Sequence, residues 1–187
     1  FDLPLQQSLK AETQAFVAEL IAEDRPVTQL LKSDIGFLNT RLRDHYKLRG
    51  IKLIPGGGLQ RVGLESDHRS GLLTQASILK VTADGSVTSP VLRGVWVNER
   101  ILGRHIPPPP ESVPAIEPDI RGAVSIRDQL AKHTNSTSCA SCHDKIDPSG
   151  FALESYDPIG QYRIAYGSKT NSARVDPSGI TPDGIRF

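Results

Sequence analysis

Apolar residues recur at helical spacing in the first part of the chain, with charged and polar residues between them. The first such segment covers residues 5–23 and is interrupted at Asp24-Arg25-Pro26, so we predict one amphipathic helix there. Pro26 suits the first turn of a further short helix that reaches Leu31. The apolar positions of the first segment are Leu5, Leu9, Phe16, Val17, Leu20 and Ile21.

A third helical pattern follows in residues 34–49. Ser33 or Asp34 can cap this helix, and Gly50 can end it. His45 lies seven residues after Leu38 and therefore on the apolar side of the predicted helix. The apolar positions of this pattern are Ile35, Leu38, Leu42 and Tyr46.

The middle of the chain alternates between turn signals and short apolar runs. Residues 50–70 are typical of a loop around three consecutive glycines, and no Lys-Ser or Lys-Thr pair follows that would indicate a phosphate-binding loop. The apolar run 72–79 fits a short helix or a buried strand. Ser89 is a good N-cap and Pro90 fits the first helical position, so we predict a helix that Gly103 ends.

Prolines and turn residues separate the remaining elements. The four prolines at 107–110 predict an extended polyproline strap. Ser125 and Asp128 resemble a capping box and predict a helix that extends through His133. With 37% hydrophobic residues, 16 glycines and 14 prolines, the composition favours a mainly α fold of short helices joined by long Pro/Gly-rich loops.

Charge and hydropathy exclude some classes of partner. The formal net charge of +1 gives no reason to expect a nucleic acid or an anionic membrane surface as a partner. No apolar run approaches the ~18 residues of a transmembrane helix. Because the sequence contains no methionine, we expect Phe1 to be a cut end rather than a translation start.

The strongest chemical signal is Cys139-Ala140-Ser141-Cys142-His143. A Cys-x-x-Cys-His sequence is typical of a site for one covalent haem c. The two thiols add across the two vinyl groups of the porphyrin, and the histidine supplies an axial nitrogen to the iron. We expect a short helical turn to hold all three groups on one side.

Other interpretations of the two cysteines stay open. A thioredoxin-like redox pair belongs on the strand-to-helix turn of a βαβ unit, and the sequence shows no such unit. A zinc site needs four ligands, and Cys139 and Cys142 are the only cysteines in the chain. A structural disulfide between them leaves His143 without an explanation.

Residues after the motif are candidates for the haem surroundings. Phe151 is the first of several apolar residues that could form a wall for the porphyrin. The guanidinium of Arg163 could pair with a haem propionate, and a surface ion pair is the equal alternative. The further wall candidates are Leu153, Tyr156 and Ile159.

The absence of methionine also bears on the far side of the iron. The His/Met ligation of small cytochromes c cannot form within this chain, and no histidine follows His143. Of the four upstream histidines we prefer His45 as the distal metal ligand, because it lies on an apolar helix side. His133, His68 and His105 are the other candidates, and water or a non-histidine ligand is the remaining possibility.

Several motifs match one family in order along the chain. They run from Thr88 to Val97, from Cys139 to His143, from Ile146 to Pro148, from Gly150 to Glu154 and from Gly160 to Arg163. With these motifs the sequence resembles the multidomain cytochrome-c-like proteins of planctomycetes, which are built from domains of unknown function. The resemblance implies that residues 1–49 are an N-terminal helical segment that ends one family domain and that 50–166 form a mono-haem cytochrome-c-like domain. Residues 167–187 are then a turn-rich tail that begins another domain.

These features predict an exported c-type cytochrome module that carries one covalent haem for electron transfer within a larger protein or complex. Its partners would be redox proteins and other chains or domains. Covalent haem attachment outside the cytoplasm places it in the periplasm or an equivalent compartment. The alternatives are a haem redox enzyme of the peroxidase or oxidase type, with an open sixth iron position, and a haem-stabilised structural subunit.

Overall fold

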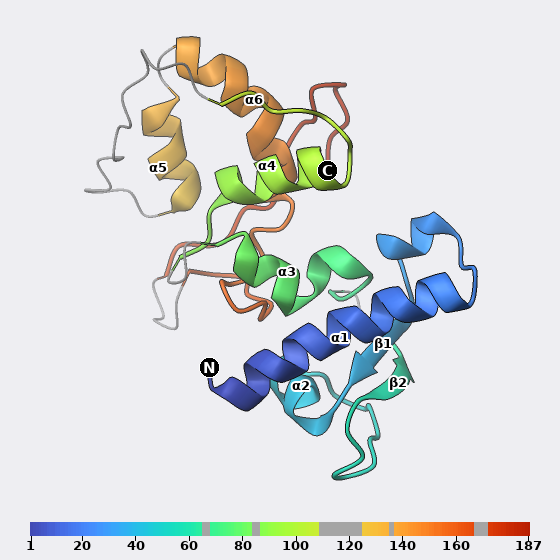
Figure 1. Ribbon diagram of the computed structural model, residues 1–187. Coiled ribbons are helices and arrows are strands. Elements are labelled where there is room, and N and C mark those ends of the chain that lie inside the picture. The colour runs from blue at the N-terminus through green and yellow to red at the C-terminus, as the bar shows by residue number, and fades with distance from the viewer. Residues whose placement is uncertain (65–67, 84–86, 109–124, 135–136, 167–171) are drawn as a thin grey trace. The chain divides into compact units, whose positions relative to one another are not determined.

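The computed structural model describes residues 1–64, 68–83, 87–108, 125–134, 137–166 and 172–187 (Figure 1). The chain forms two compact units. The first consists of Phe1–Val87 together with Tyr156–Tyr162, and the second of Thr88–Ser155 together with Arg163–Phe187. The chain therefore returns to the first unit for seven residues after most of the second has formed.

The first unit begins with the longest helix of the described residues, α1 (Leu3–Ala22). The Asp2 side chain caps it by accepting a hydrogen bond from the backbone of Leu5, and Pro4 lies in its first turn. Leu5, Leu9 and Phe16 are buried along it. The short 3₁₀ helix η1 (Val27–Leu30) follows. The first was predicted from the apolar spacing and the second from Pro26, and the structure confirms both, the second as a 3₁₀ helix.

The predicted helix over residues 34–49 is wrong in its first part. Ile35–Leu38 form strand β1, which pairs antiparallel with β2 (Gln60–Gly63) in the register Ile35↔Gly63. Helix α2 starts only at Thr40 and ends at His45. The side chain of Asn39 caps α2 by accepting from the backbone of Leu42, which separates strand from helix. The partner strand β2 lies within the stretch predicted as a loop.

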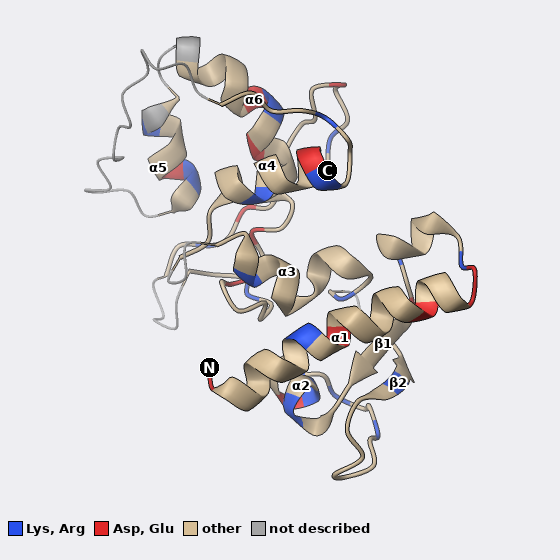
Figure 2. Ribbon diagram, in the orientation of Figure 1, with Lys and Arg blue, Asp and Glu red and all other residues tan. Residues whose placement is uncertain are grey.

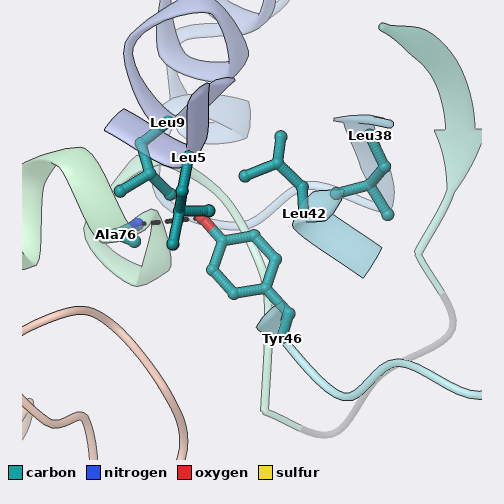
Figure 3. Packing of buried hydrophobic residues seen from close by; sticks show 6 residues of the cluster. All are labelled: Leu5, Leu9, Leu38, Leu42, Tyr46 and Ala76. Atoms are coloured by element: carbon teal, nitrogen blue, oxygen red, sulfur yellow. Dashed lines mark hydrogen bonds between the residues drawn. The ribbon is translucent and has the colours of Figure 1, made fainter. Parts of the chain in front are cut away.

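The 3₁₀ helix η2 (Leu72–Thr74) is followed by helix α3 (Ala76–Val81). The first unit buries its hydrophobic core between α1, β1, α2 and α3 (Figure 3). Residues 72–79 are thus helical rather than extended. The Tyr46 hydroxyl accepts a hydrogen bond from the backbone of Ala76 at 3.1 Å and donates one to Glu12 at 2.5 Å. The core cluster is Leu5, Leu9, Leu38, Leu42, Tyr46 and Ala76.

The second unit is built on α4 (Pro90–Arg100), α5 (Ile126–His133) and α6 (Thr137–Phe151). Ser89 caps α4, and Ser125 and Asp128 form a full capping box on α5, so both predicted starts are confirmed. Helices α4 and α6 pack very closely. A methyl group added to Gly94 would lie 2.1 Å from the Ile146 carbonyl oxygen. This approach excludes a larger residue at Gly94.

Polar groups are buried beside the α4–α6 contact. The side chains of Arg93 and Glu154 are both 0% exposed, and their charged atoms lie 3.7 Å apart. Arg93 also donates to the Leu153 carbonyl oxygen at 2.9 Å. Thr88 donates to Glu154. This buried cluster ties α4 to the segment that follows α6.

The described residues of the tail, 172–187, are turn-rich, as predicted for 167–187. Bridges join Ala165 to Arg174 and Ile180 to Arg186. The predicted polyproline strap at 107–110 lies partly outside the described residues. Among the described residues, no helix is long and apolar enough to cross a membrane. Basic and acidic residues are interspersed over the described parts of each unit (Figure 2).

The structure supports a mainly α fold, with one two-stranded sheet in the described residues. The two compact units are divided after Val87. The boundaries at 49 and 166 were implied by the family resemblance and stay predictions about domains of the family.

Candidate haem-attachment site

Helix α6 brings the three residues of the Cys-x-x-Cys-His motif together. Cys142 and His143 follow Cys139 by three and four positions, so all three lie on one face of the helix. Both cysteines are free thiols, Cys139 partly buried and Cys142 exposed. The motif sits on a helix of 15 residues, not on the short helical turn that the sequence suggested.

The next turn of α6 supplies a carboxylate to His143. Nδ1 of His143 lies 3.0 and 3.1 Å from the two carboxylate oxygens of Asp147. Both side chains are largely buried, with 15% and 13% of their surface exposed. Burial raises the pKa of the Asp147 carboxyl, and the nearby His143 partly opposes that rise. With Nδ1 donating to Asp147, Nε2 is the nitrogen that would coordinate a metal.

A cavity of about 310 Å³ lies beside His143. Phe151 borders it, one turn beyond Asp147, so the structure places this predicted wall residue at the candidate site. Arg127 of α5 also borders the cavity, and its guanidinium carbon lies 3.9 Å from the centre of the Phe151 ring. Residues 179–182 of the tail form the other wall. The cavity thus combines an imidazole, an aromatic ring and a cation.

The other wall candidates are divided between the units. Leu153 belongs to the second unit, with His143, whereas Tyr156 and Ile159 belong to the first. Tyr156 donates its hydroxyl hydrogen to the His68 carbonyl oxygen, which lies in the same unit. Phe151 is therefore the wall candidate that the structure brings to the cavity beside His143.

Arg163 has protein partners in the second unit. Its Nη2 lies 2.6 Å from a carboxylate oxygen of Glu154 and 2.8 Å from the Thr88 hydroxyl. Burial raises the pKa of Glu154, and the Thr88 hydrogen bond and the Arg163 charge partly offset this. The ion pair is buried on the Glu154 side rather than at the surface. A contact between Arg163 and a propionate stays a prediction.

Both ring nitrogens of His45 have partners within the first unit. Nε2 lies 2.7 Å from the Ile159 carbonyl oxygen, and Nδ1 lies 3.4 Å from the side-chain nitrogen of Gln161. Burial lowers the pKa of the His45 imidazole. These contacts describe a neutral histidine that joins α2 to the returning segment. Ligation of iron by His45 would require one of these hydrogen bonds to break, so these contacts give the predicted ligation no support.

The remaining candidate histidines have different surroundings. The His68 ring stacks on that of Tyr162, with ring centres 3.8 Å apart. The side chain of His105 is 82% exposed and its Nδ1 is 3.9 Å from a carboxylate oxygen of Glu99. The side chain of His133 lies outside the described residues. The distal ligand of the iron is therefore not assigned by these contacts.

The geometry bears on the alternative interpretations of the cysteines. Within the described ranges, no group of three or more His, Cys, Asp or Glu residues could hold a metal ion by itself. In the described part of the chain, α6 follows helix α5 rather than a parallel strand, unlike a thioredoxin-like site. Two free thiols lie on one helix face and are followed by an oriented imidazole, and covalent haem attachment stays a prediction.

Asp147 is the residue of the site that the sequence interpretation missed. It follows His143 by four positions, which places it on the same helix face only where the helix extends as far as Asp147. We expected only a short helical turn at the motif, and such a turn does not extend to Asp147. A search for a carboxylate one turn after the motif histidine could have found it.

Comparison with known proteins identifies two families along the chain. Residues 69–166, more than half of the chain, match the family described as PSCyt3, protein of unknown function (DUF1588). Residues 1–48 match the family described as PSD4, protein of unknown function (DUF1592). Both are domains of the planctomycete-type cytochrome-c-like proteins that the motifs resemble. No curated protein and no solved structure matches the chain.

Proposed function

The chain belongs to the PSCyt3 family of proteins of unknown function, and from this premise we propose that it is a c-type cytochrome module for electron transfer. The observation that carries the proposal is the single helix face that presents Cys139, Cys142 and His143, with the imidazole oriented by Asp147. This arrangement supplies each protein group that one covalent haem c requires on its proximal side.

The two thiols and the imidazole have separate tasks. When haem is attached, each thiol of Cys139 and Cys142 would add across one porphyrin vinyl group, so that a carbon–sulfur bond forms and the thiol hydrogen passes to the other vinyl carbon. No electrons are gained or lost in this addition. His143 would offer Nε2 to the iron, and Phe151 lines the cavity beside it. A bound haem supplies one-electron exchange between its ferric and ferrous states.

Electron transfer is favoured over catalysis by the surroundings of His143. A peroxidase-like site needs acid and base groups poised over an open iron position. No second histidine borders the cavity in the described part of the chain. Arg127 directs hydrogen bonds to the carbonyl oxygens of Asp176 and Ser178 in the tail. These contacts give Arg127 a structural task at the cavity.

The family points to a module that works within a larger assembly. We propose that the protein acts in the periplasm or an equivalent exported compartment, where haem is attached covalently. Its partners are then redox proteins and other domains or chains of one complex. The balanced surface charge favours neither a nucleic acid nor an anionic membrane as a partner.

A visible spectrum before and after acid-acetone extraction tests the proposal. The chain would be exported in a host with c-type haem maturation, beside the double variant Cys139→Ser/Cys142→Ser and the control Ser141→Ala. We expect haem bands that stay with the wild-type protein and with the control but are absent from the double variant. Bands lost to the solvent, or no bands, would overturn covalent attachment.

The same spectra separate electron transfer from catalysis. Low-spin bands that do not respond to cyanide or peroxide are expected of an electron-transfer haem with both axial positions filled. High-spin bands that shift on addition of either reagent would favour the redox enzyme with an open sixth position. Loss of folded protein without haem, combined with no redox exchange with any one-electron carrier, would favour a structural role.

A further inference from the structure

We propose that Asp147 is a positioning residue that lowers the midpoint potential of the iron by strengthening His143 as an electron donor. The inference rests on the proposed function, because it concerns the histidine that would ligate the haem. It adds a specific residue and a direction of tuning, neither of which follows from the Cys-x-x-Cys-His sequence. Asp147 acts through His143 and does not itself contact the iron.

The geometry of the pair is that of a carboxylate holding an imidazole. Both oxygens of Asp147 lie within 3.1 Å of Nδ1, so the carboxylate accepts the Nδ1 hydrogen whichever oxygen is used. The two residues are one turn apart on the same helix, which fixes their relative orientation.

Burial makes the contact strong. Both side chains are mostly shielded from water, and electrostatic interactions weaken less with distance in such surroundings. The other charged groups at this cavity do not share the buried contact of Asp147 with His143. Asp144 borders the same cavity but is exposed, and the charge of Arg127 is paired with Asp176 at 3.1 Å. Asp147 is thus the carboxylate whose hydrogen bond reaches the ligand histidine.

The direction of the effect follows from charge. A carboxylate acceptor shifts negative charge onto the imidazole and raises its basicity, whereas a neutral acceptor does so less. A more basic ligand favours the ferric over the ferrous state, because the ferric iron carries one more positive charge. The pair therefore lowers the midpoint potential compared with a protein in which Nδ1 donates to a neutral group.

A comparison of two isosteric variants tests the inference in the full chain. Asp147→Asn removes the negative charge of the carboxylate that accepts the hydrogen bond from His143. Asp144→Asn removes an equal charge from the residue directly after His143. Covalent attachment depends on the thiols, so both variants should keep their haem. We expect Asp147→Asn to favour the ferrous state about tenfold, which raises the potential by ~59 mV for a one-electron couple. Asp144→Asn should shift it much less.

Rescue separates tuning from a structural role. Asp147→Glu restores a carboxylate and should return the potential toward that of the wild type. Equal shifts in Asp147→Asn and Asp144→Asn, or no shift in either, would overturn the inference while leaving covalent haem intact. Failure of both Asp147 variants to fold would also overturn it, since Asp147 would then serve the helix itself. A wild-type chain without covalent haem would instead overturn the proposed function.

Discussion

Gly150 of α6 lies directly against the backbone carbonyl oxygen of Pro90 in α4. A methyl group on Gly150 would lie 1.8 Å from that oxygen, far inside van der Waals contact. A second close approach, at Gly94, occurs about one turn further along α4. The helix that carries the Cys-x-x-Cys-His motif is therefore held against α4 by two positions that accept only glycine.

Gly150→Ala is expected to destabilise the second unit strongly. The obstructing atom belongs to the backbone, so α6 must shift as a whole, and we expect a loss of about 3 kcal/mol or more in the free energy of unfolding. Urea denaturation followed by circular dichroism measures it. Gly63→Ala is the matched control, because a methyl there meets nothing within 4 Å. Equal stability of the two variants would contradict the close packing.

Arg163→Gln tests whether this arginine serves the protein core or a propionate. Glu154 would keep only Arg93, at 3.7 Å, as a cationic partner, and its buried charge would be poorly compensated. We expect a loss of about 3 kcal/mol in unfolding free energy, and partial recovery in the double variant Glu154→Gln/Arg163→Gln. A stable Arg163→Gln protein with an altered haem potential would instead support the propionate contact.

Glu12 makes the stability of the first unit depend on pH. Burial raises the pKa of this carboxyl from 4.5 to about 7, although the Tyr46 hydrogen bond and Arg69 oppose the rise. Between these pH values the unfolded chain has released the proton while the folded chain retains it. Stability contributed by Glu12 is therefore lost as the pH rises from 4.5 to about 7 and stays low above that.

The measurement compares wild type with Glu12→Gln, which keeps an acceptor for Tyr46 but cannot ionise. Urea midpoints at pH 4.5, 5.5 and 7.5 would give the difference in unfolding free energy at each pH. As the pH rises, we expect the unfolding free energy of the wild type to fall relative to that of Glu12→Gln by at most about 1.4 kcal/mol per pH unit. Parallel curves for the two proteins would show that Glu12 ionises normally.

Local rules predicted several elements of this fold, and non-local contacts account for most of the rest. Ser89 with Pro90, and Ser125 with Asp128, act on their own helix ends, so their sequence alone indicates where α4 and α5 begin. Ile35–Leu38 have helical spacing, but they gain a partner strand some 25 residues later, which no local pattern reveals. The return of residues 156–162 to the first unit is equally non-local.

The candidate site shows the same division. Cys139, Cys142 and His143 are recognisable because the attachment chemistry needs those groups in that order. Asp147 was missed because its contact with His143 depends on the helix extending one turn beyond the motif, whereas only a short turn was predicted. Arg163 illustrates the opposite case, since its fit to a carboxylate was anticipated, but the carboxylate in the structure is that of Glu154. Chemical type was predictable from sequence, and the identity of the partner was not.

His45→Gln provides a direct test of the distal side. In the structure both ring nitrogens are engaged, by Ile159 and Gln161, and no lone pair is left for a metal. We therefore expect the haem spectrum to be unchanged, while the loss of these hydrogen bonds lowers the unfolding free energy by about 1 to 3 kcal/mol. His68→Gln is the control, since its ring stacks on Tyr162 in the same unit. If His45→Gln shows high-spin bands and His68→Gln does not, a hydrogen bond of His45 must break when haem binds. His45 would then be the distal ligand.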